Sequence, residues 1–215
     1  TERLMSAEEF WKAFTEYKDL LMDIDSLDKA EADKLLKRLD GDLKKYCEGL
    51  EFILGDLTEK GRTLTFTAEG DVEFFGYVEE LCEEAPILDF WEIIAFKPAK
   101  GKNVSITFGK YRLNSKNLWF LPLESEEEKG KLGLRIALED GREDDEDLLV
   151  AVYSLLEEML GEYDAATSLE YFEICPLGSN PEEEGFYPLT DLPEYVNWFI
   201  DETEKKADFK EADLK

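Results

Sequence analysis

The chain has 215 residues, of which 43% are hydrophobic and 13% aromatic, and a formal net charge of −28 at pH 7. This hydrophobic content is that of a globular protein rather than a disordered one. The negative charge disfavours binding to nucleic acids and anionic membranes, and it favours basic partners or cations. Because histidine is absent, Ser-His-Asp and Cys-His nucleophiles and His-ligated zinc are excluded.

The first part of the chain has the pattern of a helical hairpin. Ser6 and Glu9 form a capping box, and a helical stripe of aromatic and aliphatic residues follows. Asp28 can cap a second helix with an apolar side of its own, which Gly49 can end. Residues 1–49 are therefore predicted to form two paired helices.

The pattern then changes to strands. Residues 51–57 (EFILGDL) and 63–68 (TLTFTA) predict two strands joined around Lys60-Gly61. A helix capped by Asp71 and stopped by Pro86 follows, and residues 90–98 (FWEIIAFKP) predict a closing strand. Residues 50–98 thus form a β-β-α-β unit, called the first repeat below.

The same order recurs after a linker. Residues 99–117 contain a predicted hairpin, VSITFG followed by KYRLN. Residues 118–124 and 131–139 then predict two strands around Lys129-Gly130, followed by a helix that ends at Gly161 and a closing strand over 168–176. Aligning the repeats on Pro98 and Pro176 places Glu92 on Glu170. Residues 118–178 are therefore the second repeat of an internal duplication.

The last segment, residues 179–215, is predicted to be a loop and a helix with the stripe Leu192, Val196, Phe199 and Ile200, frayed from Thr203. The expected fold is α+β: a helical hairpin, two tandem β-β-α-β units forming mainly antiparallel sheet with helices packed on it, and a C-terminal helix. The two repeats can share one sheet or form a pair of sheets. We expect one compact domain overall.

Charge is unevenly distributed. Residues 97–117 carry six basic residues and no acid, whereas residues 118–184 carry 20 acids and four bases. The basic segment is a candidate site for an anion or a partner, with Lys100, Lys102, Lys110, Arg112 and Lys116 as its residues. The alternatives are protection of an exposed strand edge and neutralisation of the acidic half.

The stretch 139–149, EDGREDDEDLL, is the densest acidic run. Its candidate metal ligands are Asp144, Asp145 and Asp147, since Ca²⁺ requires several oxygen ligands. However, the run lacks the spacing of an EF-hand loop. Acidic residues are common at the start of a helix, where they complement the helix dipole. We therefore interpret the run as an extended strand-to-helix connection.

Glu92 and Glu170 are the candidate catalytic pair, because their equivalent positions in the two repeats would suit acid/base chemistry or metal sharing. The alternative is that each simply reaches solvent at the start of a strand. No glycine-rich phosphate loop is present. We expect no cofactor.

Three widely spaced cysteines, Cys47, Cys82 and Cys175, form no CxxC pair and predict reduced core thiols. No apolar run approaches the length of a membrane span, and no signal peptide pattern is visible. These features predict a cytoplasmic protein. Together with the net negative charge, they predict that it binds neither membrane nor nucleic acid. The four tryptophans are expected to pack in the core or between elements.

Residues 160–177, LGEYDAATSLEYFEICPL, and 91–98, WEIIAFKP, resemble a bacterial family with a domain of unknown function, sometimes fused to a regulator of RNase E. In that family, a helix ending in a Gly-Glu-Tyr-Asp turn leads into an apolar strand. The resemblance implies a soluble bacterial protein and supplies no catalytic residues.

Two functions remain open. The first is a non-enzymatic binding or regulatory protein whose acidic surface engages a basic protein partner. The second is a carboxylate-dependent enzyme, with or without a divalent metal, that uses Glu92 and Glu170. The missing histidine and the lack of a catalytic motif favour the first. Oligomeric state is left undetermined by the sequence.

Overall fold

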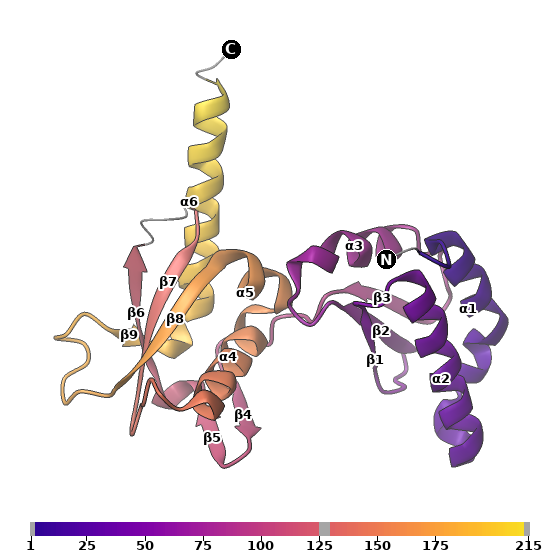
Figure 1. Ribbon diagram of the computed structural model, residues 1–215, viewed down its shortest axis with the longest axis horizontal. Coiled ribbons are helices and arrows are strands. Elements are labelled where there is room, and N and C mark those ends of the chain that lie inside the picture. Colours follow the sequence, from indigo (N-terminus) through magenta and orange to yellow (C-terminus); the bar gives the residue numbers. More distant parts are fainter. Residues whose placement is uncertain (1–2, 125–129, 213–215) are drawn as a thin grey trace. The chain divides into compact units, whose positions relative to one another are not determined.

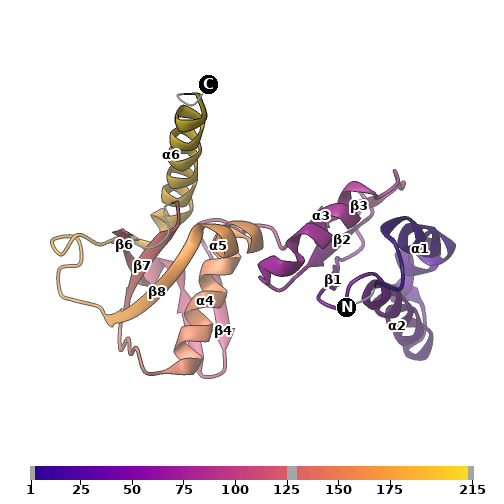
Figure 2. The ribbon, with the colours of Figure 1, turned by 45° about the horizontal axis from the view of Figure 1, so that its top comes forward.

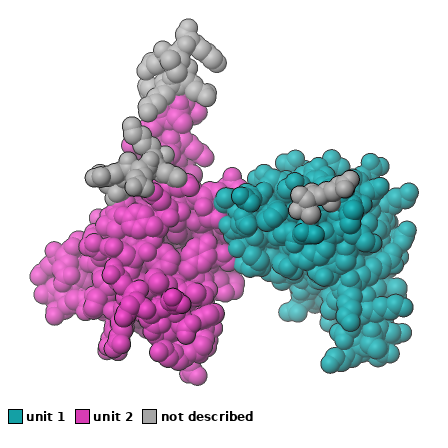
Figure 3. Space-filling view, in the orientation of Figure 1, with its two compact units in different colours: residues 1–97 teal, residues 98–215 magenta. Residues whose placement is uncertain are grey.

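The computed structural model describes residues 3–124 and 130–212 (Figure 1). They divide into two compact units, residues 1–97 (unit 1) and residues 98–215 (unit 2), which Figure 3 distinguishes by colour. The α+β class is confirmed. Where one compact domain is expected from the sequence, the structure has two units, because the repeats form separate sheets with separate cores.

Unit 1 begins with the predicted helical hairpin, α1 (Ala7–Met22) and α2 (Lys29–Tyr46), whose helices lie side by side (Figures 1 and 2). The capping box of Ser6 and Glu9 is present, and Asp28 accepts a hydrogen bond from the backbone N–H of Glu31 (2.9 Å). Each of these caps satisfies a backbone donor that the first helical turn leaves unpaired.

The first repeat follows the predicted order. Its elements are β1 (Glu51–Leu54), β2 (Arg62–Thr67), the short 3₁₀ turn η2 (Val72–Phe74), α3 (Phe75–Glu83) and β3 (Trp91–Ala95). β2 is the central strand, antiparallel to β1 and parallel to β3. The sheet is therefore mixed, because the α3 connection returns the chain to the end at which β2 began.

Aromatic side chains join the hairpin to this sheet. The rings of Phe10 and Phe66 lie 5.7 Å apart, edge to face, and those of Phe14 and Trp91 lie 5.2 Å apart. The indole N–H of Trp11 donates to the carbonyl of Leu81 in α3 (2.8 Å). Each buried aromatic contributes on the order of 1.5–3 kcal/mol through burial, and these contacts form the core of unit 1.

Arg62, at the start of β2, is a buried cation tied to the end of α1. Its guanidinium donates to the carbonyls of Met22 (2.7 Å) and Gly55 (2.9 Å) and to the carboxylate of Asp25 (2.7 Å). The sequence offered no signal for this contact, since the partners lie up to 40 residues away. Arg62 thus links the helical hairpin to the first repeat.

Unit 2 opens with the predicted hairpin, β4 (Ser105–Phe108) and β5 (Tyr111–Asn114), followed by η3 (Ser115–Asn117). The second repeat contains β6 (Trp119–Glu124), β7 (Leu132–Leu138), α4 (Glu146–Leu160), α5 (Glu162–Ser168) and β8 (Leu169–Pro176). The remaining elements are β9 (Tyr187–Pro188), η4 (Leu189–Asp191) and α6 (Leu192–Ala212). The sheet order is β8-β7-β6-β9.

The second repeat has the strand pairing of the first. β7 is antiparallel to β6 and parallel to β8, as β2 is to β1 and β3. The register is also shared. Aligning the Lys-Gly turns places Leu64 on Gly133, aligning Pro98 with Pro176 places Ile93 on Tyr171, and the structure pairs Leu64 with Ile93 and Gly133 with Tyr171. The first pair of β8, Leu169 with Leu132, is out of this register by one residue. The bulge at Glu170 brings the following residues of β8 back into it. Of the second Lys-Gly turn, Lys129 lies outside the described residues.

The core of unit 2 lies between one face of its sheet and the helices. Leu134 and Ile136 of β7 and Ile174 of β8 meet Val152 and Leu155 of α4 there. The β4–β5 hairpin adds Val104 and Leu113, and the first turns of α6 add Leu192 and Val196. Figure 2 shows β4 beside α4. The hairpin is therefore part of the core of unit 2 rather than a free linker.

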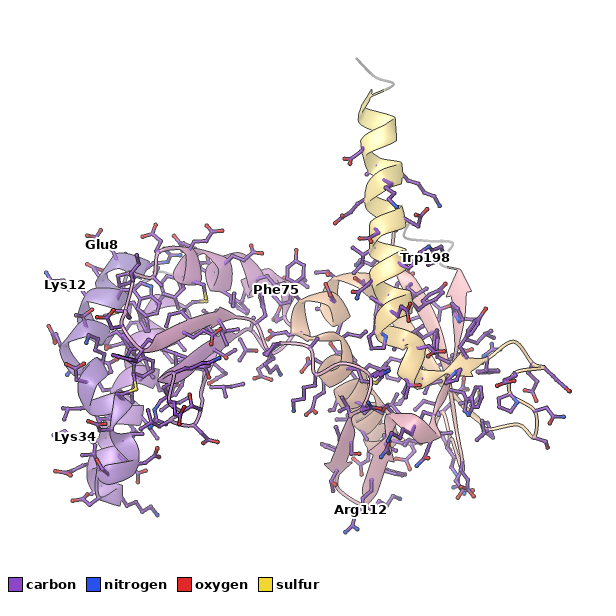
Figure 4. All side chains as sticks on the ribbon, turned by 180° about the vertical axis from the view of Figure 1, so that it is seen from behind. Glu8, Lys12, Lys34, Phe75, Arg112 and Trp198 are labelled. Atoms are coloured by element: carbon purple, nitrogen blue, oxygen red, sulfur yellow. The ribbon has the colours of Figure 1, made fainter. Side chains whose placement is uncertain are left out.

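Three local predictions need correction. The Gly-Glu-Tyr-Asp segment begins the short helix α5 instead of a turn into a strand, since Gly161 changes the chain direction with φ 84° and ψ 157°. α6 continues to Ala212, well beyond Thr203. Trp198 is 55% exposed on α6 and points to solvent (Figure 4), although Trp11 and Trp91 are buried as predicted.

Candidate functional site

Hydrogen bonds close the base of the basic hairpin in unit 2. Ser115, which is fully buried, donates from Oγ to the carbonyl of Lys102 (2.7 Å) and accepts from the N–H of Val104 (3.1 Å). Asn114 Oδ1 accepts from the backbone N–H of Lys116 (3.0 Å). These bonds hold the two ends of the hairpin together and fix the backbone from which its cations project.

The hairpin meets the acidic run at Asp145. One oxygen of this carboxylate accepts from the N–H of Leu148 (3.1 Å) as the N-cap of α4, and the other accepts from the Tyr111 hydroxyl. Lys110 Nζ lies 3.9 Å from the same carboxylate. The Tyr111 hydrogen bond is the main cause that holds the pKa of Asp145 below its ordinary value, with the backbone donor next. Asp145 is thus a helix cap that also anchors the hairpin.

The rest of the acidic run surrounds the start of α4. Asp144 and Asp147 are exposed, and Glu146 and Asp147 occupy the first helical turn. Among residues 3–124 and 130–212, the structure contains no group of three or more Asp, Glu or Cys side chains placed to hold a metal ion. The run connects the end of β7 at Leu138 to the start of α4 at Glu146.

The five predicted cations are divided among different surroundings. Lys100 forms an ion pair with Glu158 (3.0 Å) on α4, and Lys110 faces Asp145. Lys102 is exposed. Arg112 and Lys116 are exposed and make no ion pair with any acid in the part of the chain that the structure describes. Figure 4 shows Arg112 on the hairpin, projecting away from the unit.

A pocket of about 470 Å³ lies beside Arg112 and Lys116. Its walls come from the hairpin and η3, from the start of β6, from the end of β7 and from the residue after β8. The other lining residues are Leu113, Asn114, Asn117, Leu118, Trp119, Leu138, Glu139 and Leu177. Two of the predicted cations are therefore brought together at one cavity.

A smaller cavity of about 310 Å³ contains Asp164, a residue that was not among the predicted site residues. Lys100, Met159, Pro193 and Asn197 are among its lining residues. Burial raises the pKa of Asp164 above its ordinary value. The sequence signal was present in the Gly-Glu-Tyr-Asp segment, but the segment was expected to form a turn, whereas it begins the helix α5.

Glu92 and Glu170, the predicted catalytic pair, have different environments. Glu92 of unit 1 is exposed on β3 and lies opposite Thr63 in the strand register. Glu170 of unit 2 is at the bulge of β8, and its Oε2 is buried and has no hydrogen-bond partner among the residues that the structure describes. A buried carboxylate oxygen without a partner is uncommon in native proteins, and it makes Glu170 the more unusual of the two.

The acidic stretch of unit 1, residues 63–96, was not among the predicted sites. Residues 63–96 contain no basic residue and nine acids, namely Glu69, Asp71, Glu73, Glu79, Glu80, Glu83, Glu84, Asp89 and Glu92. Glu80 pairs with Arg3 (2.6 Å) and Glu69 with Lys97 (3.1 Å), and Asp71 caps η2. The other six are exposed and make no ion pair within the described residues. A count of charge along the sequence could have found this surface.

Exposed apolar side chains lie in the same stretch. Ile87 is fully exposed and Phe90 is 69% exposed in the loop between α3 and β3, and Val72 is exposed ahead of α3. Phe90 has a φ of 65°, which is rare for a bulky residue. Its carbonyl accepts from the N–H of Arg62 (2.9 Å). The backbone of Phe90 is therefore fixed to β2 while its ring faces solvent. We call residues 69–92 the α3–β3 surface.

The three cysteines are free thiols with raised pKa values. All three are free, and Cys47 is buried. Burial raises the pKa of all three thiols, and that of Cys82 reaches about 12. A thiol with a raised pKa forms little thiolate at neutral pH and is a poor nucleophile.

None of the helices within the described ranges is long and apolar enough to cross a membrane. Comparison with known proteins found no matching family model, no matching curated protein and no matching solved structure.

Proposed function

We propose that this protein is a non-enzymatic binding or regulatory protein that engages a basic protein partner through the α3–β3 surface. The observation that supports the proposal is the combination of six exposed acids without ion-pair partners in the described chain and the outward side chains of Ile87 and Phe90. Unpaired charges of one sign attract an oppositely charged partner and accelerate its association.

The exposed apolar side chains supply the buried contact area of an interface, which charge alone does not. An isolated exposed hydrophobic residue is ordinary, but Ile87 and Phe90 lie only three residues apart in a loop whose end is tied to β2. A fixed backbone reduces the conformational entropy that binding costs. The partner surface is therefore expected to have basic residues around an apolar pocket, because buried apolar anchors with a polar rim carry most interface energy.

The proposal is tested by capture from a bacterial lysate, followed by calorimetry with the captured protein once purified. The double variant Ile87→Ser/Phe90→Ser is expected to weaken binding by about 2 kcal/mol or more, as for two interface anchors. Val150→Ser, which changes a half-exposed residue of α4 in unit 2, is the matched control and is expected to bind like the wild type.

Raised salt should also weaken binding, because it screens exposed charges. The proposal is wrong if no basic protein binds stoichiometrically at low salt. It is equally contradicted if a basic protein binds the double variant as tightly as the wild type.

The enzymatic alternative rests on a narrower observation, the unpartnered Oε2 of Glu170. A thermal-shift screen with Mg²⁺ and Ca²⁺ tests it on the wild type and on the Glu92→Gln and Glu170→Gln variants. The alternative requires a metal-dependent shift that the Glu170→Gln variant loses. An equal shift in all three proteins, or none, would remove its support.

The origin and location of the protein are also proposals. The segments 91–98 and 160–177 support membership of the bacterial family named above, and the shared strand pairing of the repeats supports an internal duplication. Free, high-pKa thiols fit a reducing compartment, and we therefore infer a cytoplasmic location. The net charge supports the absence of nucleic acid and membrane partners.

A further inference from the structure

The pocket beside Arg112 and Lys116 has a charge that contrasts with its unit. Residues 98–215 carry 13 basic and 28 acidic residues, a charge of −15. The pocket lining carries two cations against the single acid Glu139. Neither cation is paired within residues 3–124 and 130–212, although acids are abundant in the unit. Neutralisation of neighbouring acids therefore does not explain why these two cations lie here.

The pocket is built on fixed backbone. Ser115 ties η3 to the start of the hairpin, and the side chain of Asn114 holds the N–H of Lys116. On the opposite wall, the N–H of Leu177 donates to the carbonyl of Leu138 (2.9 Å) and joins the ends of β7 and β8. The backbone of the pocket walls is therefore already held in place when a ligand binds, which lowers the entropic cost of binding.

The lining residues also indicate the chemical class of a ligand. Four leucines and Trp119 supply apolar walls, and the lining also includes Arg112, Lys116, Asn114 and Asn117, whose side chains carry polar groups. A volume of about 470 Å³ lies within the range of small-molecule sites. The guanidinium and ammonium suit a carboxylate or phosphate, to which they make charge-assisted hydrogen bonds.

We propose that this pocket binds a small organic anion with a flat apolar body and one phosphate or carboxylate group. The body lies against Trp119 and the leucines, and the exposed side chains of Arg112 and Lys116 turn from solvent to contact the anionic group at the mouth of the pocket. The many acids of unit 2 repel long polyanions, and the ligand is therefore a small molecule rather than a nucleic acid. The site belongs to unit 2 and is independent of the α3–β3 surface.

Phenyl phosphate and benzoate are suitable probes, added to the full chain and followed by ¹H–¹⁵N NMR. Saturable shifts are expected for the indole N–H of Trp119 and for the side-chain amides of Asn114 and Asn117. Inorganic phosphate, which lacks the apolar body, and benzyl alcohol, which lacks the charge, should each bind about tenfold more weakly than phenyl phosphate. A preference for benzoate over phenyl phosphate would assign the site to carboxylates, and the reverse to phosphates.

Variants locate the site. Arg112→Gln and Lys116→Gln are each expected to raise the Kd of the preferred probe about tenfold. Lys102→Gln removes a cation of the same basic segment that does not line the pocket, and it should change the Kd less than about twofold. Circular dichroism checks that each variant is folded. The proposal is overturned if neither probe gives saturable shifts, if inorganic phosphate binds as well as phenyl phosphate, or if Lys102→Gln weakens binding as much as Arg112→Gln.

Discussion

Individual carboxylates in this chain differ in role because their surroundings differ. Asp145 is held ionised by the Tyr111 hydroxyl and a backbone N–H, whereas Asp164 loses hydration at a cavity and makes no ion pair within the described residues. The first environment lowers the pKa of Asp145, and the second raises the pKa of Asp164. With 53 acidic residues in the chain, a carboxylate's effect on stability therefore depends on the neighbours that its place in the fold provides.

Asp164 gives a test of this point through pH. Its pKa is raised in the folded protein, so ionisation at neutral pH opposes folding, and this cost disappears as the pH falls below the ordinary aspartate pKa of about 3.9. Asp164→Asn is therefore expected to raise the melting temperature at pH 7, by an amount that shrinks as the pH is lowered toward 3. Thermal denaturation of both proteins from pH 3 to pH 8 measures it. An equal difference at every pH would contradict the stated cause.

At the scale of elements, side-chain contacts between segments distant in sequence hold each unit together. Arg62 joins the start of β2 to the end of α1, and Tyr111 joins the basic hairpin to the N-terminus of α4. The two repeats have the same strand pairing but differ in how their connecting helices are extended, by η2 in the first and α5 in the second. The two repeats thus share their strand pairing and differ in the segments that connect the strands.

Arg62→Ala is expected to lower the free energy of unfolding of unit 1 by about 2–4 kcal/mol, because it leaves buried carbonyls without donors. Chemical denaturation of the variant, followed by tryptophan fluorescence, checks this value. Arg38→Ala, which removes an exposed ion pair with Glu16, is the matched control and should cost no more than about 1 kcal/mol. Similar losses for the two variants would show that Arg62 has no special role.

At the scale of the whole molecule, the boundary between units falls at Lys97 and Pro98, next to the predicted end of the first repeat. Each unit has its own sheet and its own buried aromatic or aliphatic core. The proposed functions divide in the same way, since the α3–β3 surface belongs to unit 1 and the anion pocket to unit 2.

Residues 1–97 and 98–215, expressed separately, are therefore expected to fold, since each contains a complete core. Circular dichroism and thermal melting of each fragment should show cooperative unfolding. A fragment that lacks helical signal or melts without a transition would show that its core is incomplete. Mixing the fragments is the control, because recovery of structure only in the mixture would contradict independent folding.

The sequence by itself determined the order and type of nearly all elements. Capping residues such as Ser6 and Asp28, the Lys60-Gly61 turn and the apolar periodicities depend on neighbours within a few positions, and such local signals survive in any tertiary context. The same reasoning placed Asp145 at the start of a helix and the basic hairpin between the repeats.

Only the tertiary structure decided which distant residues meet. The separation into two sheets, the Arg62 contacts and the junction of Tyr111 with Asp145 follow from long-range packing, which no local pattern specifies. The pocket beside Arg112 and Lys116 depends on three chain segments converging, and the outward side chains of Ile87 and Phe90 depend on a backbone tied to β2. Local interactions set the elements of this protein, and the packing between them sets its candidate sites.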